Sequence, residues 1–416
     1  MMAREALGRG AQFEMKVIQS DILTGIPPEA ELLLRSARAH LSPGESDRIA
    51  ALLQKELDWA YLKEIALRNG LMPILYQRLK SHANSIPRSI LTQWRHHSLS
   101  SAARSLVMTE ELLSLLELFK AKGILAVPYK GPVLAASLYR DLTIRPFGDL
   151  DILIQRKDVF KAMDLMTSLG YQPHFQLTRT QVAAFLKSKY EFPLTHRNGW
   201  LTVELKWNLV EEFFSFPIDQ EGLWKRLHPL PLNGKEILTF SPEDLLIILC
   251  MHGAIHLWAN LMWICDIAQL IDVHKDLDWE FVLKHAHTLR SERMLYLGLF
   301  LSARLLRTSL PEEVDHRIEA DTVVRKLSQE VIEHLFLKPN GNPALRESAF
   351  FHLRARECLI DRFLYSTRLA MTTTPEDWNF CSLPDPLFAF YHLLRPIRLA
   401  LKYWIQPLRG ASVRHG

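Results

Sequence analysis

The sequence is short of glycine and cysteine, and it has no long apolar run. Gly makes up 17 of 416 residues, about 4% against a usual figure of about 7%, so few positions need a positive φ and a helix-rich protein is expected. The four cysteines are too few for a disulfide scaffold and indicate a reducing compartment. No stretch of about 20 uninterrupted apolar residues would span a bilayer, and the first 15 residues lack the apolar core of a secretory signal. A cytoplasmic protein is therefore expected.

A strong excess of charge is also missing, because 50 Lys and Arg face 46 Asp and Glu. This balance gives no strong nucleic-acid signal. The serine-hydrolase elbow, the Walker A loop and the dinucleotide-binding glycine pattern are all absent, which excludes the commonest hydrolase, NTPase and dinucleotide-binding signatures. Apolar residues make up 48% of the chain and charged residues 23%, so what remains is a folded globular protein.

The hydrophobic pattern of the sequence changes along the chain, from helical spacing to a mixture of helix and strand patterns and back to helical spacing. Amphipathic spacing predicts helices before and after a central region of short apolar strands, so we expect an α+β protein with a small mixed sheet between two helical regions. Five segments are predicted: a loose start (1–27), an N-terminal helical domain (28–123), an α/β core (124–232), a C-terminal helical domain (233–386) and a basic aromatic tail (387–416).

The central region has clear strand and turn signals. Residues 124–127 form a short apolar run typical of a buried strand, and 149–154 form another strand. Two further runs, 190–194 and 201–209, flank Asn198-Gly199, and Asn-Gly between two such runs predicts a β-hairpin. The core should therefore end in an antiparallel pair.

Two aspartates give the strongest chemical signal. Side chains alternate along a strand, so Asp149 and Asp151 point to one face while Leu150, Ile152 and Ile154 cover the other. Two negative charges so close need a positive neighbour, and Mg²⁺ (or Mn²⁺) prefers carboxylates together with substrate phosphates. Glu204, on the hairpin, would be a third acid, and three acids would hold the two metal ions of in-line phosphoryl transfer. The alternative is an exposed strand face with solvated acids.

A possible phosphate site precedes these acids. Lys130-Gly131 joins a predicted buried strand to a helix beginning at Pro132, and free N–H groups at a helix N-terminus attract phosphate. Lys130 would add a charge for a triphosphate and Arg145 would hold its oxygens. The alternative is a tight turn with a surface lysine.

These motifs together resemble the uncharacterised nucleotidyltransferases of the polymerase β-like superfamily. The shared pattern is met in order by Lys130-Gly131, Leu138-Tyr139, Arg145-Pro146 and Gly148 to Leu153, and the likeness runs from about Glu56 to Ala268. The resemblance implies a minimal nucleotidyltransferase fold with a metal-bound NTP. It also implies Asp149 and Asp151 as metal ligands and Glu204 as the third acid.

The chain departs from this family pattern at two places. The wider superfamily opens its helix with Gly-Ser, where this chain has Lys130-Gly131. Members often carry Asp-Leu-His-Trp on the later strand, where this chain has Glu204-Leu205-Lys206-Trp207, which places a cation beside the third acid.

Two further features lie downstream. His252 and His256 share a helix face, but Gly253 replaces the glutamate of a zinc hydrolase, so packing beside Trp258 and Trp263 is the main interpretation. The resemblance also allows His256 or Asp266 to position an acceptor. The tail contains Arg395, Arg398, Lys402, Arg409 and Arg414 among aromatic residues and no acid, so it would either lie on an anionic membrane surface or pack on the body with its cations outward.

The function expected from these features is transfer of an NMP group from an NTP such as ATP to an unknown acceptor, with release of pyrophosphate. Two alternatives remain. One is a protein on the same fold that binds a nucleotide or partner without turnover. The other is an adaptor at the inner membrane face that uses its basic tail.

Overall fold

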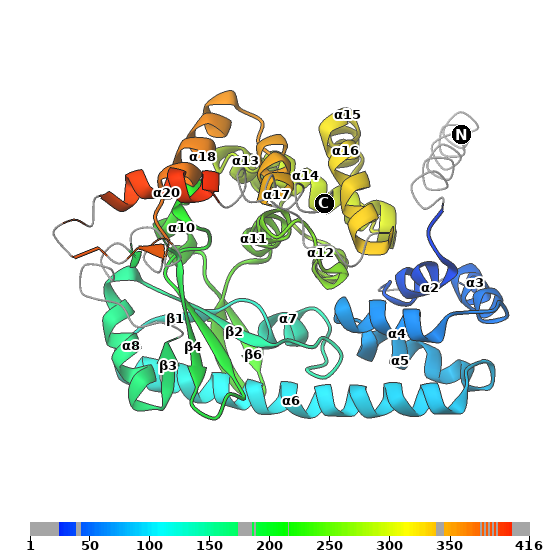
Figure 1. Ribbon diagram of the computed structural model, residues 1–416. Coiled ribbons are helices and arrows are strands. Elements are labelled where there is room, and N and C mark those ends of the chain that lie inside the picture. Colours follow the sequence, from blue (N-terminus) through cyan, green and yellow to red (C-terminus); the bar gives the residue numbers. More distant parts are fainter. Residues whose placement is uncertain are drawn as a thin grey trace, which may run out of the picture. The chain divides into compact units, whose positions relative to one another are not determined.

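The computed structural model describes residues 25–38, 43–173, 185–186, 189–214, 216–337, 345–374, 377, 380–381, 383–384, 387 and 390–401. As the sequence predicts, this is an α+β protein in which helices precede and follow a five-stranded mixed sheet (Figure 1). Among the described residues there are two compact units. Unit 1 comprises the described residues within Met1–Leu116, Pro128–Leu150 and Asp219–Ala355. Unit 2 comprises the described residues within Glu117–Val127, Asp151–Ile218 and Arg356–Gly416. The five segments expected from the sequence stay a prediction.

Unit 1 begins with helices whose ends follow local capping rules. The Asp58 carboxylate accepts hydrogen bonds from the backbone N–H groups of Ala60 and Tyr61 at the start of α4, and Asn69-Gly70 ends this helix, with Gly70 at φ +64°. The buried side chains are apolar residues at helical spacing, including Leu62 and Ile65. The elements are α2 (Pro28–Ser36), α3 (Pro43–Leu53), α4 (Trp59–Arg68), α5 (Met72–Leu79), the short η1 (Lys80–Ser85) and the long α6 (Arg88–Ala121).

The later part of unit 1 is helical as well. Ser241 caps α11 by accepting a hydrogen bond from the Asp244 N–H, as its position before Pro242 predicts. Helices α11, α12 and α14 pack on one another and bury most of their apolar side chains. The elements are α7 (Pro132–Ser137), α10 (Gln220–Lys225), β6 (His228–Leu232), β7 (Lys235–Thr239), α11 (Pro242–Ile255), α12 (Leu261–Val273), α13 (Trp279–Thr288), α14 (Glu292–Leu306), α15 (Glu312–Ala320), α16 (Thr322–Ile332), η4 (Glu333–Leu337) and α17 (Leu345–Arg354).

The glycine between the two histidines of α11 has a packing role. The chain turns back after α11 through Leu257 and Trp258, both with positive φ, and the Trp258 N–H donates to the Gly253 carbonyl at 2.7 Å. The Trp258 ring is then fully buried against Gly253, where an added Cβ would lie only 2.4 Å from a ring carbon. Gly253 is therefore required by the ring, which agrees with the packing interpretation of this segment.

Unit 2 is built on the five-stranded sheet. The strand order is β1-β2-β5-β4-β3, and the β3/β4 and β4/β5 pairs are antiparallel. The hairpin predicted around Asn198-Gly199 is present, with Glu191 opposite Lys206 and Leu194 opposite Val203. The boundary between the units falls within β2, after Leu150. The strands are β1 (Ala126–Pro128), β2 (Asp149–Ile154), β3 (Tyr171–Pro173), β4 (Glu191–His196) and β5 (Thr202–Lys206).

Three arginines of unit 2, Arg356, Arg395 and Arg398, are buried. Arg356 is buried with its guanidinium 4.3 Å from the Tyr365 ring centre, and it donates to the Phe214 carbonyl at 2.9 Å. Arg395 and Arg398, on α20, are buried on the carboxylate of Asp377. The helices are η2 (Arg156–Asp158), α8 (Val159–Ser168), η3 (Glu212–Phe214), α18 (Leu359–Met371) and α20 (Tyr391–Ala400).

This arrangement corrects one expectation about the basic tail. Both alternatives expect the cations of the tail to point outward. This expectation is wrong for Arg395 and Arg398, which are buried in ion pairs with Asp377. The exposed face of α20 is apolar instead, with Leu393 at 62% and Ile397 at 54% exposed. Lys402, Arg409 and Arg414 lie outside the described residues, as does most of the predicted loose start.

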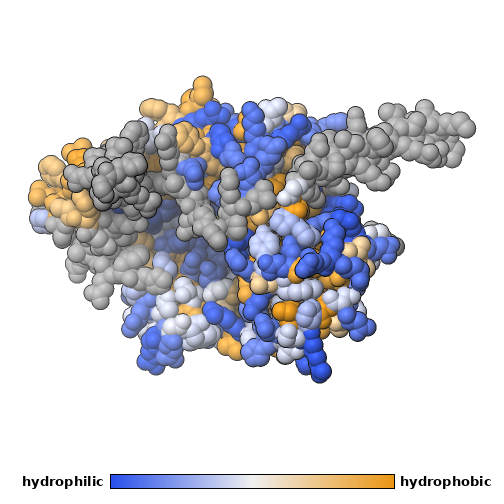
Figure 2. All heavy atoms as spheres, turned by 45° about the vertical axis from the view of Figure 1, so that its right-hand side comes forward, coloured by the Kyte–Doolittle hydropathy of each residue, from blue (hydrophilic) through white to orange (hydrophobic). Residues whose placement is uncertain are grey.

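No described helix is long and apolar enough to cross a bilayer, as the sequence predicts. On the face drawn in Figure 2, hydrophilic residues cover much of the described surface.

The packing of Trp258 on Gly253 can be tested by Gly253→Ala. The new methyl group would overlap the ring and shift the turn, costing about 1–3 kcal/mol, so the melting temperature should fall by several degrees. Gly44→Ala, also in a helix but with no atom within 4 Å of the added Cβ, is the control and should not lower it. Equal melting temperatures for the two variants would contradict the packing role.

Candidate active site

The strand, turn and helix around Lys130-Gly131 are present. After β1 the chain turns at Gly131, with φ +54° and ψ −119°, a conformation that favours glycine, and α7 follows. An added Cβ at Gly131 would lie 3.5 Å from the Asp149 carbonyl oxygen and from the Phe147 ring. The turn is thus seated against the first residue of β2. Helix α7 has only six residues, so a bound phosphate would gain little from its dipole.

Lys130 forms a hydrogen bond with His252, one of three neighbouring aromatic side chains in unit 1. Its Nζ donates to Nδ1 of His252 at 3.2 Å, which leaves the proton of a neutral His252 ring on Nε2. The His252 ring lies 4.5 Å from the His256 ring and 4.9 Å from the Trp263 ring, centre to centre. Lys130 is half-buried and its ammonium is directed onto α11.

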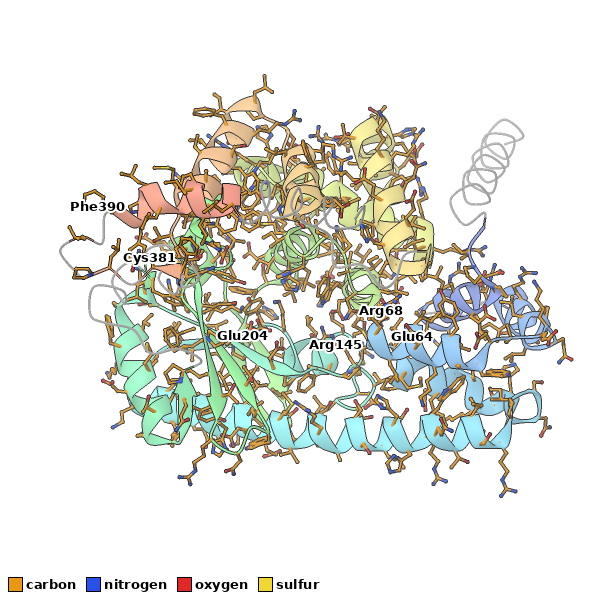
Figure 3. The ribbon with its side chains drawn as sticks, in the orientation of Figure 1. Glu64, Arg68, Arg145, Glu204, Cys381 and Phe390 are labelled. Atoms are coloured by element: carbon orange, nitrogen blue, oxygen red, sulfur yellow. The ribbon has the colours of Figure 1, made fainter. Side chains whose placement is uncertain are left out.

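Arg145 and Asp266 bind one another in unit 1. Arg145, in the loop between α7 and β2 (Figure 3), donates from Nε and Nη2 to the two carboxylate oxygens of Asp266 at 2.8 and 2.7 Å. Tyr139 donates its hydroxyl to the same carboxylate at 3.0 Å, and burial, followed by the Asp266 charge, raises the Tyr139 pKa well above its usual value. Asp266 is fully buried and Arg145 is 6% exposed. This pair fixes the loop that leads into β2.

The two aspartates lie on β2 as the alternation predicts. Leu150, Ile152 and Ile154 are buried on the other face of the strand. Asp149 is half-buried at the start of the strand, and Asp151 is only 6% exposed. The alternative of an exposed face with solvated acids is therefore wrong for Asp151.

Asp151 belongs to a cluster of charges in unit 2 that is centred on Lys206. The Lys206 Nζ lies 3.2 Å from Oδ1 of Asp151 and 2.7 Å from Oε2 of Glu204, and it also bonds to Glu191. The Tyr190 ring centre is 4.9 Å away, and the Lys206 side chain is 3% exposed. One buried ammonium thus joins acids from β2, β4 and β5, with Glu204 on β5 (Figure 3).

Glu204 has a strongly altered acidity in this cluster. Burial is the largest cause that raises its pKa, and the charges of Asp151 and Glu191 act in the same direction. Lys206 lowers it, and the net result is a pKa of about 7. Glu204 therefore changes its charge near neutral pH.

The acids differ in how well they suit a divalent cation. Asp149 and Asp151 share a face of one strand and fit the oxygen ligands of Mg²⁺. Glu204 fits less well, because its carboxylate accepts a hydrogen bond from Lys206 at 2.7 Å, whereas Asp151 forms only an ion pair with that ammonium at 3.2 Å. Within the part of the chain that the structure describes, no group of three or more His, Cys, Asp or Glu side chains is arranged to hold a metal ion.

The structure thus groups the predicted residues differently from their expected roles. Arg145, which was expected to bind phosphate, forms an ion pair with Asp266, which was expected near the acceptor. Asp151 and Glu204 are both ion-paired with Lys206. His252 and Glu191 were missed as members of these groups. The spacing from His256 identifies His252, whereas Glu191 is found only from its register opposite Lys206.

Comparisons with known proteins agree with the motif. A family model described as "Uncharacterised nucleotidyltransferase" matches residues 55–307, more than half of the chain. A search of the curated proteins finds none that matches.

Two solved structures are similar over part of the chain. The lincosamide antibiotic adenylyltransferase LnuA, with lincomycin bound, is 15% identical, covers 39% of this chain and 96% of its own, and has a TM-score of 0.29. An antigenic nucleotidyltransferase-like protein from Paracoccidioides brasiliensis is 16% identical, covers 51% and 96%, and has a TM-score of 0.30. These scores are low, so the assignment of the family rests on the sequence model.

The buried pair of Arg145 and Asp266 predicts a non-additive loss of stability. Arg145→Met alone leaves a buried carboxylate without its guanidinium and should cost about 3–5 kcal/mol. Adding Asp266→Asn removes that charge, so the double variant should melt at a higher temperature than the single one. Arg317→Met, at an exposed helical pair, is the control and should leave the melting temperature nearly unchanged. A double variant that melts below Arg145→Met would be incompatible with this account.

The raised pKa of Glu204 predicts a stability that depends on pH. Because the folded pKa of about 7 lies above the ordinary value of 4.5, this group favours the fold below about pH 4.5, and the contribution is lost as pH rises through 7. The difference corresponds to at most about 3 kcal/mol. The melting temperature of the native chain should therefore fall between pH 5 and 8 relative to that of Glu204→Gln. Glu221→Gln, at a side chain that is 90% exposed, is the control and should follow the native chain.

Proposed function

The chain belongs to the uncharacterised nucleotidyltransferase family, and on this premise we propose that it transfers an NMP group from an NTP to an acceptor and releases pyrophosphate. The observation that carries this proposal is the Asp149 and Asp151 pair on one face of β2, directly after the loop fixed by Arg145 and Asp266. Paired carboxylates in this family context suit a divalent ion that carries the phosphates of an NTP.

The proposed reaction divides the work among the described side chains. Asp149 and Asp151 would hold the divalent cation, Mg²⁺ or Mn²⁺, which when bound neutralises charge on the phosphates. Lys130 would bind a phosphate oxygen from the Gly131 turn, and its bond to His252 directs its ammonium. An acceptor oxygen would attack the α-phosphorus, a P–O bond would form there, and the bond to the pyrophosphate oxygen would break.

The remaining predicted residues have narrower proposed roles. Arg145 would act on the phosphates chiefly by fixing the loop before β2, because two of its nitrogens bind Asp266. His256, which is exposed beside His252, would lie in the acceptor pocket, whereas the fully buried Asp266 would act through Arg145.

The decisive experiment is calorimetry with ATP, GTP, CTP and UTP, with and without Mg²⁺. The native chain should bind at least one NTP in a Mg²⁺-dependent way, and Asp149→Asn with Asp151→Asn should weaken this binding roughly tenfold or more because the cation loses its ligands. Asp164→Asn, on the exposed face of α8, is the matched control and should bind as the native chain does. Equal binding by the native chain and the double variant would contradict the proposal.

One observation favours a second candidate, a protein on the same fold that binds nucleotide without turnover. Lys206 already neutralises part of the carboxylate cluster, which leaves fewer oxygens for the cations of catalysis. A pyrophosphate-release assay with a panel of sugars, small metabolites, proteins and RNA separates the two candidates. Mg²⁺-dependent NTP binding without release for any acceptor would favour the binding protein.

A further inference from the structure

Lys206 is bound much as a metal ion is bound. Its ammonium lies within the reach of one carboxylate from each of three strands: Asp151 of β2 at 3.2 Å, Glu204 of β5 at 2.7 Å, and Glu191 of β4. The ammonium donates hydrogen bonds to Glu191 and Glu204 and forms an ion pair with Asp151. The Tyr190 ring adds a face that attracts a cation, 4.9 Å from the nitrogen.

The position of Lys206 is imposed by the sheet. Glu191 lies directly opposite Lys206 in the register of β4 and β5, and Glu204 precedes it by two residues on the same face of β5. The side chain is 3% exposed, so the ammonium has little water around it and depends on these acids. The ammonium donates hydrogen bonds to Glu191 and Glu204, whereas Asp151 lies at ion-pair distance and shares its strand face with Asp149. The two glutamates are therefore the acids that the ammonium draws away from a metal ion.

We propose that Lys206 is a built-in cation that replaces the second divalent ion of the site, so that the chain binds one ion, at Asp149 and Asp151, with the Lys206 charge beside it. This inference rests on the proposed function, and it replaces the two-ion site with Glu204 as third ligand that the sequence suggests. Lys206 is then a positioning residue, since it sets the number of ions without serving as a ligand.

The test is to count bound Mn²⁺ on the full chain, by electron paramagnetic resonance of free Mn²⁺ and by equilibrium dialysis, with a non-hydrolysable ATP analogue present. The count is the number of Mn²⁺ ions in each complex of protein and analogue, after the Mn²⁺ carried by unbound analogue has been subtracted. The native chain should bind one Mn²⁺ that depends on Asp149 and Asp151. Lys206→Met frees Glu191 and Glu204 and should raise the count to two, whereas Lys206→Arg keeps a cation and should leave it at one.

A second variant keeps the inference testable should Lys206→Met fail to fold. Glu204→Gln should retain the single Mn²⁺ with an affinity within about threefold of the native chain, because Glu204 is not a ligand. Loss of Mn²⁺ in Glu204→Gln would overturn the inference, as would two ions on the native chain or one ion on a folded Lys206→Met.

The two proposals fail in different ways. Two Mn²⁺ ions on the native chain would leave the proposed nucleotidyl transfer intact and remove only the role of Lys206. No Mn²⁺ on the native chain, together with no NTP binding by calorimetry, would remove both.

Discussion

Compensation of buried negative charge is the constraint on which the candidate site depends. Three strands bring carboxylates to one place, and these groups repel one another and lose water on folding. The ammonium of Lys206, whose side chain is 3% exposed, offsets this repulsion by forming ion pairs with Asp151, Glu191 and Glu204. Burial, together with the charges of Asp151 and Glu191, outweighs the adjacent cation, so the pKa of Glu204 rises to about 7. Electrostatics and strand pairing therefore support the same register.

Compensation of a buried charge also fixes Arg145 and Asp266. Asp266 is fully buried, and its oxygens are satisfied by two nitrogens of Arg145 and by the Tyr139 hydroxyl. This anchors the loop before β2 to helix α12 in unit 1, while the glycine conformation at Gly131 seats the preceding turn against Asp149. The start of the strand that carries the aspartates is thus fixed by a buried ion pair and by close backbone packing.

Sequence reasoning was sufficient for the features that depend on local rules. The strand at 149–154, the hairpin at Asn198-Gly199 and the Ser241 cap follow from alternation, turn chemistry and capping, and all are present. The family followed from an ordered motif within one stretch of chain. Side-chain partners were not accessible in this way: the tail's Arg395 and Arg398 were expected outward, yet the distant Asp377 holds them inward.

The sequence by itself determined the α+β class, the placement of Asp149 and Asp151 on one face of a strand, and membership of a nucleotidyltransferase family. These features depend on the alternation of side chains along a strand and on short motifs, both of which can be recognised in the sequence. Only the tertiary structure decided that Lys206 lies among acids of three strands and that Arg145 binds Asp266. Such pairs join residues up to 121 positions apart, and their energy exists only once the strands and helices have excluded water around them.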